Sequence, residues 1–196
     1  MPIHQPASSG QQNRALGLST FAFTVCFAVW TIFAIIGIKI KADLGLNDTE
    51  FGLLVGTPIL TGSLVRLFLG VWTDQYGGKI VFPLTMLASA ASTMLLSQAT
   101  TYPMMLLAAL GLGLAGGGFA VGIAYVSKWY PQERQGSALG FFGMGNVGAA
   151  VTKFLAPFVM VAWGWEAVAH IWAAALVVMA VIFFVFAKDD PTFARR

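Results

Sequence analysis

Six long stretches of apolar residues follow one another along the 196-residue chain, separated by short polar connections. A helix that crosses a bilayer needs about 20 consecutive, mostly apolar residues. The stretches that meet this requirement are 17–38, 51–73, 80–97, 103–126, 137–161 and 167–187. The pattern predicts an all-α membrane protein whose six transmembrane helices occupy residues 17–187, between an N-terminal tail (residues 1–16) and a C-terminal tail (residues 188–196).

Composition excludes several other classes of protein. The chain is 58% hydrophobic and only 10% charged, whereas about a quarter of the residues in a soluble domain are charged. Its net charge of +3 comes from scattered residues rather than a basic run, which argues against nucleic-acid binding. The sequence contains no nucleophile–base pair and no cluster of metal ligands. We therefore expect no enzymatic activity, no metal and no cofactor.

Basic residues are divided unequally between the two sides of the predicted bundle. If both termini lie on one side, the other side receives only Lys39 and Lys41. The side of the termini receives Arg14, Lys79, Lys128, Arg134, Lys188, Arg195 and Arg196. Cytoplasmic loops carry an excess of lysine and arginine. The bias therefore predicts that both termini are cytoplasmic, in a plasma membrane or a bacterial inner membrane.

Two charged side chains, Arg66 and Lys153, fall inside the predicted helices, and all eight acidic residues lie outside them. A basic side chain at the centre of a membrane helix costs at least about 2.5 to 3.5 kcal/mol, so such a residue indicates a functional site. A cation without a carboxylate partner favours an anionic ligand. The alternative for both residues is snorkelling to the interface or bonding to backbone carbonyls, and it is strongest for Lys153.

Several neutral residues lie at the same predicted depth as Arg66. Asn146 is about 15 Å into the fifth helix, and Arg66 is about 12 Å into the second from the same side. Gly143 and Gly145 closely precede Asn146, and Phe119 lies in a glycine-rich part of the fourth helix. The glycines either let helices pack closely or let a small ligand reach the backbone. Phe119 either stacks on a planar ligand or fills the core.

The connection between the second and third helices has the sequence Gly70-Val-Trp-Thr-Asp74-Gln-Tyr-Gly77-Gly-Lys79. It resembles the cytoplasmic loop motif of the major facilitator superfamily, with a departure at glutamine 75, where a basic residue is common. Residues 43–54 and 131–140 look like that superfamily's entries to helices 2 and 5. The loop motif implies a structural role for its glycines, Asp74 and Lys79.

Within the superfamily, the chain is most similar to the nitrate/nitrite porters (NarK-type). Residues 140–157, which include Asn146 and Lys153, look like the nitrate signature on helix 5. Arg66 is similar to the porters' substrate arginine on helix 2, and Phe119 to the phenylalanine beside the substrate. The resemblance implies alternating-access transport of nitrate or nitrite. Arg66, Asn146, Phe119, Gly143 and Gly145 would then contact the anion, and Lys153 would be a candidate for coupling.

Such porters have about twelve helices, so this chain resembles their N-terminal half. In that fold each half is a 3+3 inverted repeat in which helices 2 and 5 are counterparts. These are the glycine-interrupted spans that carry Arg66 and Asn146. We expect the chain, surrounded by membrane lipid, to pair with a second six-helix half or with a copy of itself. Two alternatives stay open: a facilitator for another small anion, and a truncated membrane module that does not transport.

Overall fold

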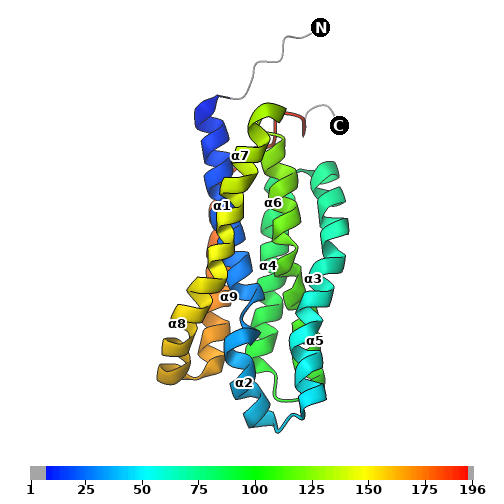
Figure 1. Ribbon diagram of the computed structural model, residues 1–196, viewed down its shortest axis with the longest axis vertical. Coiled ribbons are helices and arrows are strands. Elements are labelled where there is room, and N and C mark those ends of the chain that lie inside the picture. The colour runs from blue at the N-terminus through cyan, green and yellow to red at the C-terminus, as the bar shows by residue number, and fades with distance from the viewer. Residues whose placement is uncertain (1–7, 194–196) are drawn as a thin grey trace.

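The computed structural model describes residues 8–193, which form an elongated bundle of helices (Figure 1). The helices are α1 (Ser9–Trp30), α2 (Phe33–Leu44), α3 (Asp48–Tyr76), α4 (Gly78–Gln98), α5 (Tyr102–Gly116), α6 (Gly118–Ser127), α7 (Gln132–Gly143), the 3-10 helix η1 (Met144–Val147), α8 (Gly148–Trp163) and α9 (Trp165–Phe186). They build six spans long enough to cross a membrane, which confirms the predicted number. In chain order these spans are α1–α2, α3, α4, α5–α6, α7–η1–α8 and α9, called spans 1 to 6 below.

The helices extend beyond the predicted apolar windows because polar caps begin them outside the membrane. Asn47 Oδ1 accepts a hydrogen bond from the Glu50 N–H at 2.9 Å, and Glu50 Oε2 accepts one from the Asn47 N–H at 3.0 Å. This reciprocal pair is a capping box, and it satisfies two donors at the start of α3. Ser8 and Gln11 make the same arrangement before α1, so α1 begins at Ser9, well before the predicted apolar window.

Three of the six spans are interrupted. Span 1 breaks after Trp30, span 4 breaks at Gly117, and span 5 contains η1. Span 2 is the single unbroken helix α3, although it contains Pro58. The prediction of a glycine interruption is therefore right for span 5 and wrong for span 2. A glycine inside a helix costs only about 1 kcal/mol, which packing against a neighbouring helix offsets.

Glycines bring the spans into close contact. A β-carbon at Gly113 of α5 would lie 1.7 Å from Thr61 Oγ1 and 3.0 Å from the backbone nitrogen of Gly62, both in α3. A β-carbon at Gly148 of α8 would lie 2.1 Å from the Thr24 carbonyl oxygen in α1. Only glycine permits backbones to approach this closely, as is common between membrane helices. Close packing therefore accounts for these glycines.

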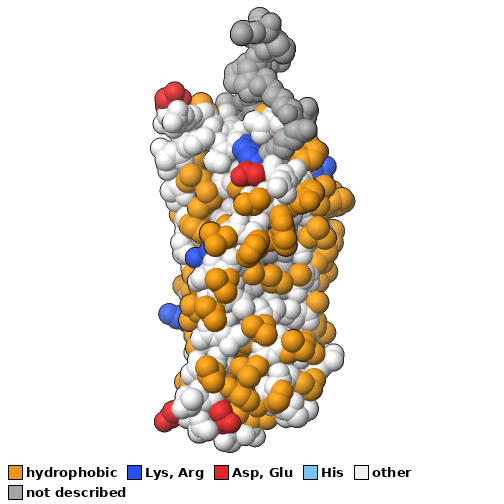
Figure 2. Space-filling model, turned by 90° about the vertical axis from the view of Figure 1, so that its right-hand side faces the viewer, with side chains coloured by type: hydrophobic (Ala, Val, Ile, Leu, Met, Phe, Trp, Pro, Cys, Tyr) orange, Lys and Arg blue, Asp and Glu red, His pale blue; other side chains and the backbone are white. Residues whose placement is uncertain are grey.

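Charged side chains gather mainly at the two ends of the bundle, and the surface between them is largely apolar, apart from basic side chains at mid-height (Figure 2). We call the end where α1 begins and α9 ends the basic end. There Tyr125 Oη donates to the Lys188 carbonyl at 2.6 Å and joins α6 to the segment after α9. Five of the predicted cytoplasmic basic residues are described, whereas Arg195 and Arg196 lie outside the described residues, as do residues 1–7 of the predicted N-terminal tail.

Spans 2 and 5 are the least buried parts of the bundle. In each of them 22% of the most apolar 18-residue window is buried, compared with 44–56% in the other four spans. Large apolar side chains are exposed along both, among them Leu67 and Phe68 on α3 and Phe154 and Phe158 on α8. These two spans also carry the charged residues predicted to lie inside the membrane.

Candidate functional site

Arg66 lies in the middle of α3, and its guanidinium group reaches the helix break in span 4. Arg66 Nε donates a hydrogen bond to the Gly116 carbonyl oxygen at 3.1 Å. That carbonyl is available because the Ala120 N–H donates to Gly117 O, at 3.0 Å, instead of continuing the helical pattern to Gly116. Residues at a helix end leave carbonyls that need other donors. Arg66 supplies the donor for the Gly116 carbonyl.

Two aromatic rings flank the guanidinium group. The Arg66 Cζ atom lies 5.4 Å from the centroid of the Trp30 ring and 5.8 Å from that of Phe119. Both distances are within the range of about 6 Å in which a ring face attracts a cation. Phe119 also packs against Phe23 and Phe142, with centroids 5.3 and 5.9 Å apart. It thus packs against the core, one of the two roles considered for it, and also lies beside Arg66.

Trp30 is held in place by the backbones of two other helices. Its Nε1–H donates to the Pro58 carbonyl at 2.9 Å. β-Carbons at Gly62 and Gly116 would lie 2.9 and 2.8 Å from the indole ring, so these glycines make the space that the ring occupies. The indole is therefore wedged between α3 and α5 directly beside Arg66. A side chain at position 62 would overlap the indole ring, so this position requires glycine.

A hydrogen-bonded chain fixes the end of α1 from the other side. Thr152 Oγ1 of α8 donates to the Ala28 carbonyl at 2.6 Å and accepts a bond from Trp172 Nε1 of α9 at 2.9 Å. All these groups are buried, where unpaired polar atoms are costly. The break that presents Trp30 is thus tied to spans 5 and 6.

Within residues 8–193, Arg66 has no ion pair, and its hydrogen bond to Gly116 is the only one it makes. A guanidinium group carries five N–H donors, so the four on the two terminal nitrogens have no partner in the described part of the chain. Nε is hydrogen-bonded to Gly116, and the Trp30 and Phe119 ring centroids lie 5.4 and 5.8 Å from Cζ. The edge formed by the terminal nitrogens is the part that can bind a ligand.

The predicted residues of span 5 are arranged differently. Asn146 lies in η1, is exposed, and donates from Nδ2 to the Gly143 carbonyl at 2.8 Å. A β-carbon at Gly145 would lie 2.4 Å from Phe23, so this glycine packs against α1, while Gly143 has open space beside it. Lys153 is exposed and makes no ion pair among residues 8–193. Within the described chain, only Phe119 of the predicted partners contacts Arg66.

Trp30 borders the candidate site but is not among the residues that the sequence predicts there. Tryptophan in a membrane protein usually marks the interface, and nothing in its spacing distinguished it. A weak signal does follow it: the hydroxyl of Thr31 donates to the carbonyls of Phe27 and Ala28 at 3.0 and 3.2 Å. Threonine hydroxyls that bond back to the preceding turn often bend helices, and here the helix ends.

The loop motif forms a compact corner at the basic end. Asp74 Oδ1 lies 2.6 Å from Lys128 Nζ, a close charge contact without the alignment of a hydrogen bond. Lys79 Nζ lies 4.0 Å from Asp189 Oδ2. Gly77 has φ +82°, which strains any other residue, while Gly70 has open space around it. The motif joins the turn between α3 and α4 to α6 and the segment after α9.

Two proteins with similar sequences align with most of this chain. A protein from Thermus thermophilus named "Probable nitrate/nitrite antiporter NarK1" is 40% identical over 92% of this chain and 44% of its own length. A "Probable nitrate transporter NarT" from Staphylococcus carnosus is 32% identical over 86% of this chain and 44% of its own length. The chain therefore spans less than half the length of these relatives.

The fold also matches solved transporters. A bacterial homologue of the human lysosomal transporter Spinster, in an inward-facing and unoccupied conformation, superposes with a TM-score of 0.82 at 20% identity, over 94% of this chain and 45% of that one. The six-helix unit thus corresponds to half of such a transporter. The sequence model of the Major Facilitator Superfamily matches residues 18–196. This chain is accordingly a multi-pass integral membrane protein that belongs to the major facilitator superfamily, a family of transporters and not of enzymes.

Proposed function

We propose that this chain forms one half of an alternating-access porter for a small planar anion, nitrate or nitrite, and that Arg66 is its principal anion ligand. The observation that carries the proposal is the state of the guanidinium group. Nε is bound to Gly116 and two aromatic ring centroids lie 5.4 and 5.8 Å from Cζ, whereas the terminal N–H groups have no partner in residues 8–193. A planar fork of this kind binds two oxygens of an oxyanion at once.

The shape of the site favours a flat ligand. A planar anion bound to the free edge of the guanidinium group lies in the plane of that group, with the Trp30 and Phe119 rings close to Cζ. Asn146 keeps one N–H of Nδ2 beyond its bond to Gly143, and we assign this donor to a remaining oxygen of the anion. Gly143 leaves open space there. We assign Gly145 an indirect role, because it sets the position of η1 against α1.

The exposed faces of spans 2 and 5 call for a covering partner. A charged group that faces lipid is costly, and Arg66 is only partly buried by this chain. We propose that a second six-helix half, or a second copy of the chain, covers these spans and completes the anion site. A related superfamily structure has about twice the length of this chain. We expect no anion binding by an isolated monomer.

We further propose that the basic end is cytoplasmic, as the lysine and arginine bias indicates. A single cysteine placed at position 2 or after residue 196 should resist an impermeant thiol reagent added outside intact cells. Cys26 is fully buried, so its background labelling should be low. Labelling of either added cysteine from outside would reverse the orientation.

Transport is tested by reconstituting the assembled protein, with and without a candidate second half, into liposomes. We expect uptake of labelled nitrate or nitrite that chloride and sulfate do not inhibit. Uptake of another small anion in preference to nitrate would instead support the facilitator alternative. No anion uptake in any pairing, from protein that is correctly folded, would support a membrane module that does not transport.

A further inference from the structure

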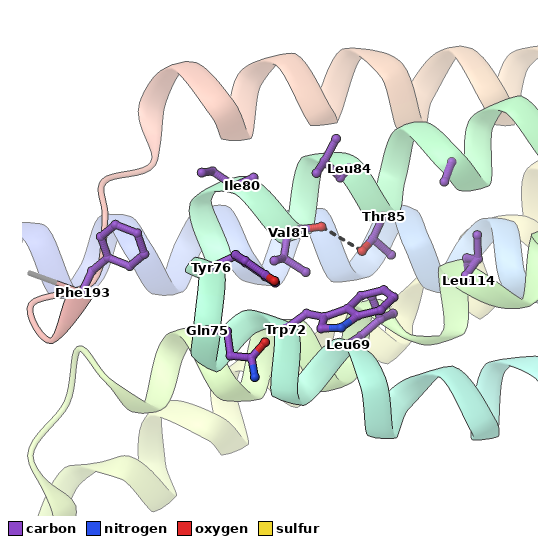
Figure 3. A pocket seen from close by; sticks show the side chains of 11 residues that line it. Leu69, Trp72, Gln75, Tyr76, Ile80, Val81, Leu84, Thr85, Leu114 and Phe193 are labelled. Atoms are coloured by element: carbon purple, nitrogen blue, oxygen red, sulfur yellow. Dashed lines mark hydrogen bonds between the residues drawn. The ribbon is translucent and has the colours of Figure 1, made fainter. Parts of the chain in front are cut away.

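An apolar groove of about 600 Å³ runs between α3 and α4 (Figure 3). Its walls include Leu69, Trp72 and Tyr76 of α3 and Ile80, Leu84 and Ala88 of α4. Trp72 follows Arg66 by six residues, so the two side chains point about 120° apart around α3. Arg66, Trp30 and Phe119 do not line the groove, so it is separate from the proposed anion site.

A second apolar groove, of about 320 Å³, lies on the other side of α4, between α4 and α9. Pro83 and Leu87 line it from α4, and Val181 and Phe184 line it from α9. Ile80 and Leu84 belong to both grooves, so a single ridge separates them. Each groove runs along α4 from Ile80 for about 10 to 12 Å, at 1.5 Å per residue.

A lysine stands where the two grooves begin. Lys79 directly precedes the shared residue Ile80, and its ammonium group lies 5.9 Å from the ring of Phe184 in the second groove. Its contact with Asp189 is long, at 4.0 Å, and the side chain of Asp189 is 48% exposed. Gln75 and Tyr76 add polar groups beside the first groove (Figure 3). The basic end of α4 thus places the Lys79 ammonium group close to the start of both apolar grooves.

We propose that an anionic phospholipid straddles α4 at this position, with one acyl chain in each groove and its phosphate on Lys79. Lipid tails are as apolar as the groove walls, so the grooves gain van der Waals contacts and no hydrophobic driving force. Selectivity must therefore come from the head group, which a lysine near the membrane surface attracts when it is anionic. The phosphate takes the place of Asp189, whose carboxylate moves into the surrounding water.

The test uses the assembled protein, exchanged in detergent with phosphatidylglycerol or phosphatidylcholine of identical acyl chains and examined by native mass spectrometry. We expect one phosphatidylglycerol to be retained per chain, with about fivefold preference over phosphatidylcholine, the scale of one lysine at a membrane surface. Lys79→Ala should abolish the preference, and Lys79→Arg should keep it. Lys39→Ala, at the opposite end of the bundle, is the matched control and should change nothing.

A second pair of variants tests the grooves independently of the charge. Ala88 is exposed and lines the first groove, so Ala88→Phe should fill it and reduce retention of both lipids. Ala174 is exposed and lines neither groove, so Ala174→Phe should leave retention unchanged. Equal retention of the two lipids by the unaltered protein, or loss of lipid from Ala88→Phe and Ala174→Phe alike, would overturn the proposal. So would a preference that survives Lys79→Ala, and so would occupation of the grooves by a second protein chain.

Discussion

Spans 2 and 5 both carry polar groups inside the membrane, but the fold fixes these groups to very different degrees. Arg66 stands on an unbroken helix, where a carbonyl and two rings orient it. Span 5 is broken by η1, and its Asn146 bonds to its own backbone while Lys153 is exposed. For the proposed porter, this difference implies a division of labour, in which span 2 supplies a preformed ligand and span 5 supplies groups that a partner completes.

The largest expected effect comes from removing the fork of Arg66. Arg66→Lys keeps the charge and loses the planar pair of donors. We expect nitrate affinity to fall by about ten- to a hundredfold, the scale of one hydrogen bond to a charged group. Isothermal titration of the assembled transporter measures this. Unchanged affinity would remove Arg66 from the site, whereas loss of folded protein in both Arg66→Lys and Arg66→Ala would indicate a purely structural arginine.

Two glycine variants in span 5 compare a glycine that packs against α1 with one that has open space beside it. A β-carbon at Gly148 meets the backbone of α1, so Gly148→Ala should lower the free energy of unfolding by about 1 to 3 kcal/mol, as overpacking does. Gly143→Ala meets nothing within 4 Å and should leave stability nearly unchanged. Thermal unfolding of the assembled protein in detergent compares them. If Gly148→Ala and Gly143→Ala were equally destabilised, span 5 would not pack against α1 at Gly148.

Trp30 tests whether the arginine is truly preformed. Trp30→Leu removes both the ring beside the guanidinium group and the hydrogen bond to Pro58. We expect nitrate affinity to fall by about three- to tenfold, because a partly buried cation–ring contact contributes roughly 1 kcal/mol. Trp30→Phe, which keeps a ring, should lose less. Trp163→Leu is the control, since that tryptophan is 72% exposed; a decrease in affinity as large as that of Trp30→Leu would show that the effect is not local.

The smallest effect is expected at Lys153. Because this side chain is exposed and makes no ion pair among residues 8–193, Lys153→Ala should change nitrate affinity by no more than about twofold, the range of ordinary exposed substitutions. The same titration applies. A decrease that matches Arg66→Lys would erase the contrast between the two spans and place Lys153 in the anion site of the assembled protein.

The number and order of the spans were predictable because each apolar stretch is long enough to cross a membrane by itself. The cap formed by Asn47 and Glu50 was also predictable, because its two partners lie only three residues apart in the sequence. Breaks in spans 1 and 4 depend on contacts between helices distant in sequence, such as that of Gly113 with Thr61. The position of Trp30 follows from those breaks, so sequence spacing did not reveal it. Spacing also did not show that Gly145 faces α1 while Gly143 faces open space.

The hydrogen bond between Arg66 and Gly116 has one more consequence. Gly116 is buried, and a buried carbonyl left without its donor costs about 1 to 3 kcal/mol. An arginine that swung away to follow a departing anion would incur that cost. We therefore expect Arg66 to keep its position within this six-helix unit. In the proposed porter, the anion reaches and leaves a fixed side chain, and access to either side of the membrane changes by movement of whole helical units around it.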